Sequence, residues 1–212
     1  MVNKKFAGIY MITLMVSATS FAMPPVEDFH LATAVRAYGG PETAVMFNLP
    51  NGGGGAFTEA SIMGGTVDAT IRLTLIDGAG LPVANYPSED CWIESADNGM
   101  VICVAGSTAD SNTNLAGVTT WVTPLAAGGS SETLTVVIVN GAALTSSAGM
   151  AISHNSADIN GDRAVNLTDV PLFAGDFYGG SYAFRSDFKF DGVVNLSDVV
   201  KMAQALGASC QP

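Results

Sequence analysis

Positively charged residues are scarce in this sequence, and their scarcity argues against one large class of function. The 212 residues include eight Lys and Arg against 19 Asp and Glu, which gives a net charge of −11. Nucleic-acid binding depends on clustered Lys and Arg that neutralise phosphates, so DNA or RNA would repel such a chain. We therefore expect no nucleic-acid partner, and we expect the chain to attract divalent cations.

Histidine is rarer still, which argues against zinc chemistry and against nucleophilic catalysis. The two histidines, His30 and His154, are isolated in the sequence, whereas zinc sites need clustered His and Cys ligands. Ser153-His154 lies in no recognisable nucleophile motif. No pair of catalytic carboxylates stands in a recognisable context either. The sequence therefore indicates a non-catalytic protein.

Cysteine is limited to three residues, Cys91, Cys103 and Cys210. The turn signal Asn98-Gly99 lies between the first two, and a hairpin there would bring them opposite each other. We therefore predict a Cys91–Cys103 disulfide. Cys210 would then be free or available for an intermolecular bond.

Long apolar runs are absent beyond the N-terminus, so no later segment is expected to span a membrane. Near the start, Lys4 and Lys5 precede the short apolar run 6–16, and the small residues Ser20 and Ala22 follow. This order is typical of a cleaved secretion signal, with the mature protein beginning near Met23. We expect a secreted protein, extracellular or associated with the cell surface. Without the two signal lysines, six basic residues face 19 acidic ones, a net charge of −13.

Alternation with a period of two marks the middle of the chain. Residues 67–75 alternate strictly between apolar and polar, as a half-buried strand does, and Asp77-Gly78 follows as a turn. Further short β-prone runs, separated by turn signals, are 34–38, 44–49, 91–94, 101–105, 118–123 and 133–139. Short strands with regular turns predict an antiparallel β-sandwich over residues 23–152.

Part of this region resembles the bacterial Ig-like domains of adhesins and surface proteins. The resemblance covers residues 66–144 and is carried by the phrases ATIRLTLIDGAGLPVANYP and NLAGVTTWVTP. It implies a sandwich but no activity, since such domains serve as spacers, adhesins or ligand binders. Trp92 and Trp121 are expected in the core. An exposed pair would instead favour stacking on a carbohydrate.

The pattern changes near Ile152, where two acidic segments begin to repeat. DINGDRAVNLTD (158–169) and DFKFDGVVNLSD (187–198) start 29 residues apart, at 158 and 187. A short helix is expected after each, over 168–178 and 197–206, and no strand is expected. In the second helix the buried face is predicted to consist of Val199, Val200, Met202, Ala203 and Leu206. We place a boundary at 151–155 and a second domain at 153–212.

Both segments have the length and the oxygen pattern of a calcium loop. Calcium takes six to eight oxygen ligands, which a twelve-residue loop supplies from positions 1, 3, 5, 7, 9 and 12. The first loop offers Asp158, Asn160, Asp162, the Ala164 carbonyl, Asn166 and Asp169. The second loop offers Asp187, Asp191, the Val193 carbonyl, Asn195 and Asp198.

Each loop departs from this pattern at one position. Lys189 occupies the third position of the second loop, where an ammonium cannot donate a lone pair and would repel the ion. Arg163 occupies the sixth position of the first loop, where the sharp turn usually requires glycine, as Gly192 provides in the second. The loss of one ligand lowers calcium affinity more than a strained turn does. We therefore expect one calcium site in the first loop and a weaker one in the second.

The duplicated pattern D-x-N-x-D-x-x-x-N-x-x-D, with Asp at its last position, resembles a dockerin. The resemblance implies a small α-helical domain with paired EF-hand-type loops that docks onto a cohesin, a β-sandwich partner. Recognition in that family depends on loop positions ten and eleven, which are here Leu167 and Thr168, then Leu196 and Ser197. Gly175-Asp176 replaces a basic pair that is common in the family. The partner is therefore expected to differ from a typical cellulosomal cohesin.

Several functions remain open at this level. The favoured one is a secreted, non-catalytic adhesion or assembly component that docks onto a cohesin-like partner. In a second, the calcium module of one copy binds the sandwich of another copy, and filaments form head to tail. A carbohydrate-binding module or an enzyme with a dockerin tag are further alternatives. Finally, calcium could serve only to fold a marginal core.

Overall fold

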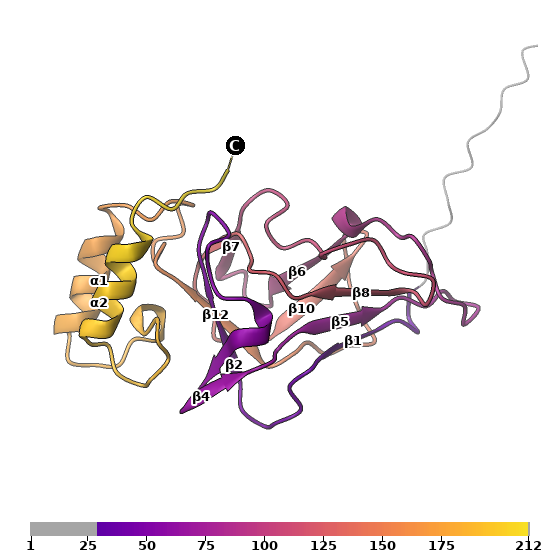
Figure 1. The fold of residues 1–212 in the computed structure, drawn as a ribbon, viewed down its shortest axis with the longest axis horizontal. Helices are drawn as coiled ribbons and strands as arrows, with labels where there is room; N and C mark the ends of the chain where they lie inside the picture. The colour runs from indigo at the N-terminus through magenta and orange to yellow at the C-terminus, as the bar shows by residue number, and fades with distance from the viewer. Residues whose placement is uncertain (1–28, 212) are drawn as a thin grey trace, which may run out of the picture.

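The computed structural model describes residues 29–211, so the expected signal peptide, residues 1–22, lies outside the described residues. The described chain is mainly β, with four sheets and two α-helices (Figure 1). We refer to residues 29–156 as the β-rich part and to residues 157–211 as the C-terminal part. No helix within residues 29–211 is long and apolar enough to cross a membrane.

Two antiparallel sheets share the main core of the β-rich part. One has the order β1 (Thr33–Arg36), β5 (Ile71–Thr74), β8 (Val118–Trp121), and the other has the order β11 (Ala142–Ala143), β10 (Thr135–Val139), β6 (Cys91–Ser95). Their inward side chains, among them Leu73, Trp121 and Ile93, are buried in one cluster. The alternation predicted for residues 67–75 is confirmed for Ala69, Ile71, Leu73 and Leu75, which are fully buried. Val67 is only partly buried, and the expected single strand is divided between β4 (Gly65–Val67) and β5.

The other two sheets lie toward the C-terminal part. One has the order β12 (Ile152–Ser156), β2 (Ala44–Asn48), β3 (Ala60–Ile62), β4 (Gly65–Val67), and in it β12 runs parallel to β2. The second is the two-stranded ladder of β7 (Met100–Ile102) and β9 (Ala127–Gly129). Short 3-10 turns η1 (Phe57–Glu59) and η2 (Ser88–Asp90) precede β3 and β6.

Strand β12 corrects the expectation that no strand follows Ile152, and the expected boundary at 151–155 falls within it. Its sequence, ISHNS, is polar, yet every residue is buried. Neutral hydrogen bonds make this possible: Asn48 Nδ2 lies 3.0 Å from His154 Nδ1, and His154 Nε2 lies 2.8 Å from Thr135 Oγ1. Burial lowers the pKa of His154 to about 4.

The C-terminal part contains α1 (Asp169–Tyr178), the 3-10 turn η3 (Phe184–Ser186) and α2 (Leu196–Ala205). The two helices lie together at one end of the molecule, beyond β2 and β12, and the chain end returns toward β7 (Figure 1). Their shared core contains Phe173, Phe188 and Met202, with Leu49 from beyond β2. Both predicted helices are therefore present, with bounds shifted by one residue.

The predicted buried face of α2 is largely wrong. Met202 is buried, but Val199, Val200, Ala203 and Leu206 are exposed, and Ala205 is buried instead. Contact through Met202 and Ala205 places only a narrow stripe of α2 on the core. An apolar face of the helix is left toward solvent.

The predicted Cys91–Cys103 disulfide is also wrong. Cys103 is bonded to Cys210, with a Cα–Cα distance of 5.5 Å, and Cys91 is a buried free thiol. The turn at Asn98-Gly99 does not close a hairpin, because β6 pairs with β10 whereas β7 pairs with β9. Cys91 therefore lies in β6, whereas Cys103 directly follows β7, a strand of another sheet.

Candidate calcium-binding loops

The two acidic loops have the same internal hydrogen bonds. Eight hydrogen bonds of the first loop recur in the second between equivalent positions, each within 0.1 Å of its counterpart. The sequence repeat is thus also a structural repeat. The hydrogen bonds agree because the two loops have the same residues at positions 1, 5, 9 and 12.

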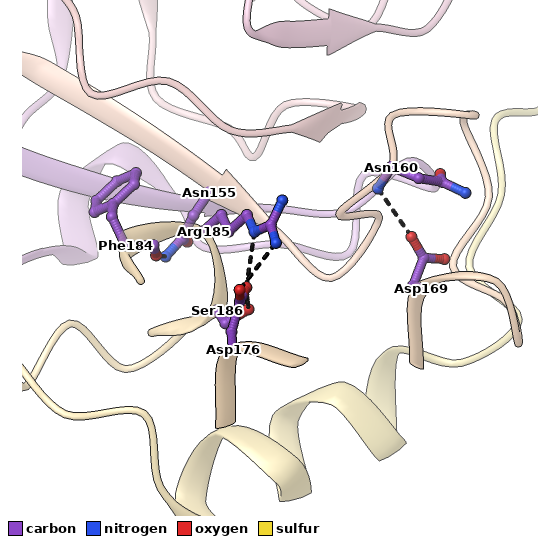
Figure 2. Close-up of polar contacts among 7 residues, drawn as sticks. All are labelled: Asn155, Asn160, Asp169, Asp176, Phe184, Arg185 and Ser186. Atoms are coloured by element: carbon purple, nitrogen blue, oxygen red, sulfur yellow. Dashed lines mark hydrogen bonds and ion pairs between the residues drawn. The ribbon is translucent and has the colours of Figure 1, made fainter. Parts of the chain in front are cut away.

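Carboxylates at the first and last positions hold each loop closed. In the first loop, Asp158 accepts hydrogen bonds from the N–H groups of Asp162 and Arg163, at 3.1 and 2.9 Å. Asp169 accepts from the N–H groups of Asn160 and Asn166, at 3.1 and 2.9 Å; Figure 2 shows the Asn160 contact. Position 12, at the start of α1, is thereby brought against the beginning of its own loop.

The turn inside each loop needs two residues with left-handed backbone. They stand at positions 4 and 6: Gly161 (φ 70°) and Arg163 (φ 72°) in the first loop, Phe190 (φ 52°) and Gly192 (φ 85°) in the second. Each loop therefore has glycine at one of these positions and a side chain at the other. A residue other than glycine in the left-handed conformation costs about 1–3 kcal/mol of folding free energy. Backbone strain was expected from the sequence only at Arg163. Phe190 adopts the same left-handed conformation in the second loop.

Four buried carboxylates make these loops electrostatically unusual. Asp158, Asp169, Asp187 and Asp198 are all fully buried, and within residues 29–211 none of them forms an ion pair with Lys or Arg. Burial, with repulsion from Asp169 and Asp162, raises the pKa of Asp158 to about 6. Burial likewise raises the pKa of Asp198. Buried anions need a compensating charge, which a divalent cation would supply.

The donor set suits a hard cation. Within residues 29–211 no group of three or more His, Cys, Asp or Glu side chains is gathered as a metal site. The loops add neutral oxygens, from Asn side chains and backbone carbonyls, to their carboxylates. Oxygen ligands of this mixed kind are those that calcium accepts, whereas zinc prefers nitrogen and sulfur. The residue types of the two loops are therefore those that calcium accepts.

The first loop has the fuller set of converging polar atoms. Oδ2 of Asp162 receives hydrogen bonds from the Asn160 amide at 3.0 Å, the Asn166 amide at 3.3 Å and the Thr168 hydroxyl at 3.4 Å. These donors lower the pKa of Asp162. In the second loop Lys189 replaces Asn160, and its side chain is exposed. The predicted ranking of the two sites rests on this difference.

The predicted partner-binding residues occupy equivalent places at the start of each helix. Leu167 is 78 % exposed and Leu196 is 72 % exposed. Thr168 is exposed as well, and Ser197 is partly buried. The Ser197 hydroxyl is buried and has no hydrogen-bond partner among the described residues. The structure thus places two similar pairs on two similar helix ends.

A polar contact that was not expected from the sequence fixes the segment between α1 and the second loop (Figure 2). Asp176 accepts hydrogen bonds from Arg185 Nε at 2.7 Å, Arg185 Nη2 at 2.9 Å and the Ser186 hydroxyl at 2.6 Å. Asn155, on β12, donates to the carbonyl oxygens of Phe184 and Asp187, at 3.4 and 2.7 Å. No sequence motif marks these residues.

Neither tryptophan supplies the exposed pair that would favour carbohydrate stacking. Trp121 is buried, and its indole N–H donates to the carbonyl of Ser107 at 2.8 Å. Trp92 is partly buried, with its indole N–H bonded to Glu94 at 2.7 Å. Carbohydrate binding therefore gains no support from the two side chains that suggested it.

Comparison of the chain with protein-family models, with curated proteins and with solved structures found no match. The candidate site consequently rests on the residues of this chain and their geometry.

Proposed function

We propose that this protein is a secreted, non-catalytic, calcium-binding assembly component whose C-terminal part docks onto a cohesin-like β-sandwich partner. The observation that supports it most is the structural duplication of the two loops, each of which has an exposed leucine, Leu167 or Leu196, next to a Thr or Ser at a helix start. The resemblance of the sequence repeat to a dockerin gives the same assignment.

Calcium binding is supported by the four buried carboxylates. Asp158 and Asp169 in the first loop, and Asp187 and Asp198 in the second, are fully buried without a cationic partner among residues 29–211. Bound calcium would supply the charge that balances them. The carboxylate, amide and carbonyl oxygens of the loops would hold the ion, and the buried N–H contacts of positions 1 and 12 would keep those oxygens oriented.

Docking is supported by the unburied face of α2. Leu196 and Val200, one turn apart on α2, are 72 and 55 % exposed, and Leu206, which caps the helix, is 44 % exposed. At the start of α1, Leu167 and Val170 are 78 and 38 % exposed. Exposed apolar side chains on a helix surface are a common feature of protein interfaces.

A binding assay tests the docking proposal. The chain 23–212 is immobilised and probed with recombinant cohesin-like β-sandwich proteins, once in millimolar calcium and once in a chelator. We expect binding only in calcium, and loss of binding in a Leu167→Asp, Leu196→Asp variant. Leu115→Asp is the matched control, since Leu115 is 92 % exposed on the β-rich part. Equal binding by both variants would contradict the assigned surface.

Self-assembly is the second candidate, because one chain carries both a β-rich part and an exposed helical face. Light scattering on size-exclusion fractions, with and without calcium, separates the two. Large assemblies that form only in calcium would favour the filament. A monomer in both conditions would favour a separate partner.

A further inference from the structure

The β7–β9 ladder lies directly against the first loop. Val101 and Gly128 stand opposite each other in this ladder. A Cβ atom on Gly128 would lie 1.8 Å from Oδ2 of Asp158, and one on Gly161 would lie 2.9 Å from Cγ2 of Val101. Gly129 N–H also donates to the carbonyl of Asp158, at 2.8 Å. The paired residues Val101 and Gly128 of the ladder therefore contact the first loop at two places, Gly128 at Asp158 and Val101 at the turn residue Gly161.

The disulfide holds the other side of the same loop. Cys103 follows β7 directly and is bonded to Cys210, whose N–H donates to the carbonyl of Arg163 at 3.1 Å. The chain end continues this pairing, since Val165 N–H donates to Ala208 O at 2.7 Å. The first loop thus lies between the ladder and the C-terminal tail, and a covalent bond joins the two.

The second loop has no equivalent of this enclosure. Its closest comparable contact is with the end of a flexible side chain: a Cβ on Gly192 would lie 3.2 Å from the terminal methyl of Met63. Its links to the β-rich part are non-covalent: Asn155 donates a hydrogen bond to the carbonyl of Asp187, and the Phe188 ring packs on Phe47 of β2, with 5.5 Å between ring centroids. The two loops share their internal hydrogen bonds, yet only the first is hydrogen-bonded to the tail that the disulfide joins to the β-rich part.

We infer that the calcium site of the first loop is a composite of both parts of the chain, in which the β7–β9 ladder and the Cys103–Cys210 disulfide position the ligands. This inference rests on the calcium binding proposed above. A loop held in place before the ion binds loses less conformational freedom on binding, so its affinity is higher. Gly128 acts on Asp158 by direct contact, and the disulfide acts on Arg163 through the tail.

Gly128→Ala tests the ladder. The backbone of Gly128 is not left-handed, so the contact with Asp158 is the main obstacle to alanine. Gly65→Ala on β4 is the matched control, since a Cβ there meets nothing within 4 Å. Calcium affinity is measured by isothermal titration calorimetry on the chain 23–212 carrying Asp191→Asn, which weakens the second site. We expect Gly128→Ala to weaken binding at least about tenfold, the usual effect of disturbing a ligand's support, and Gly65→Ala to leave it unchanged.

Cys103→Ala, Cys210→Ala tests the cross-link and decides the question if Gly128→Ala fails to fold. Cooperative thermal unfolding serves as the check of folding. Weaker calcium binding by the folded double variant, at least about tenfold, is the expected result. Unchanged affinity in both the double variant and Gly128→Ala would overturn the inference while leaving the proposed calcium function intact. Absence of calcium binding by the parent chain would overturn the proposed function itself, and the composite site with it.

Discussion

The side-chain amide of Asn155 donates a 2.7 Å hydrogen bond to the backbone carbonyl of Asp187, and so joins a buried strand of the β-rich part to the first residue of the second loop. The same amide also reaches the carbonyl of Phe184. One buried side chain therefore satisfies two carbonyls of the segment that enters the loop. The two parts of the chain are thus connected at both loops, by Asn155 at one and by the ladder and disulfide at the other.

Replacing Asn155 with alanine leaves those carbonyls without their donor. We expect Asn155→Ala to lower the free energy of unfolding by about 1–3 kcal/mol, the usual cost of an unsatisfied buried polar group. Denaturant unfolding followed by circular dichroism measures the change. Asn112→Ala is the control, because Asn112 is exposed, and it should cost less. Equal losses would show that the Asn155 contacts do not support the structure.

The cysteine pairing is open to a direct chemical test. Burial raises the pKa of the Cys91 thiol to about 12, so this thiol should resist alkylation in the native protein. In denaturant without reductant, we expect one alkylated cysteine, identified as Cys91 by peptide mass spectrometry. A label on Cys210 would instead show that Cys91 is bonded to Cys103, as the hairpin prediction had it. The first loop would then lack its covalent support.

Loss of the disulfide should also be costly for stability. The bond joins residues 107 positions apart, and closing a loop of about 100 residues is worth about 4–5 kcal/mol in the chain-entropy account. We expect Cys103→Ala, Cys210→Ala to lose several kcal/mol of unfolding free energy. Wild-type protein with reductant should behave similarly. A double variant as stable as the wild type would mean that the tail is held by other contacts.

Acid should destabilise the protein through His154. Its pKa falls from an ordinary 6.5 to about 4 in the folded state, so between these values the unfolded state binds more protons. This contribution to stability is fully present above pH 6.5 and is lost as the pH falls toward 4, about 3 kcal/mol in all. The measurement is unfolding free energy at pH 7 and pH 4.5, for wild type and His154→Gln. The variant should be less stable at pH 7 but lose less on acidification, whereas parallel losses would assign the acid sensitivity elsewhere.

Sequence reasoning succeeded where a local pattern determines the structure. The alternation predicted which side chains are buried over residues 69–75, and the spacing of the two acidic repeats predicted both helices. Strand β12 could not be predicted in this way, because its polar residues are buried only through partners distant in sequence, such as Thr135 and Asn48. The disulfide depends on which sheets β6 and β7 join. The contact between Gly128 and Asp158 likewise exists only once the chain is folded.

Calcium titration of the wild-type chain 23–212 by isothermal titration calorimetry tests the central claim most directly. We predict a stronger site in the first loop and a weaker one in the second. Asp162→Asn should remove the stronger site, and its counterpart Asp191→Asn should affect the weaker one. No binding at millimolar calcium, or binding that neither variant alters, would contradict the assignment of these loops as calcium sites.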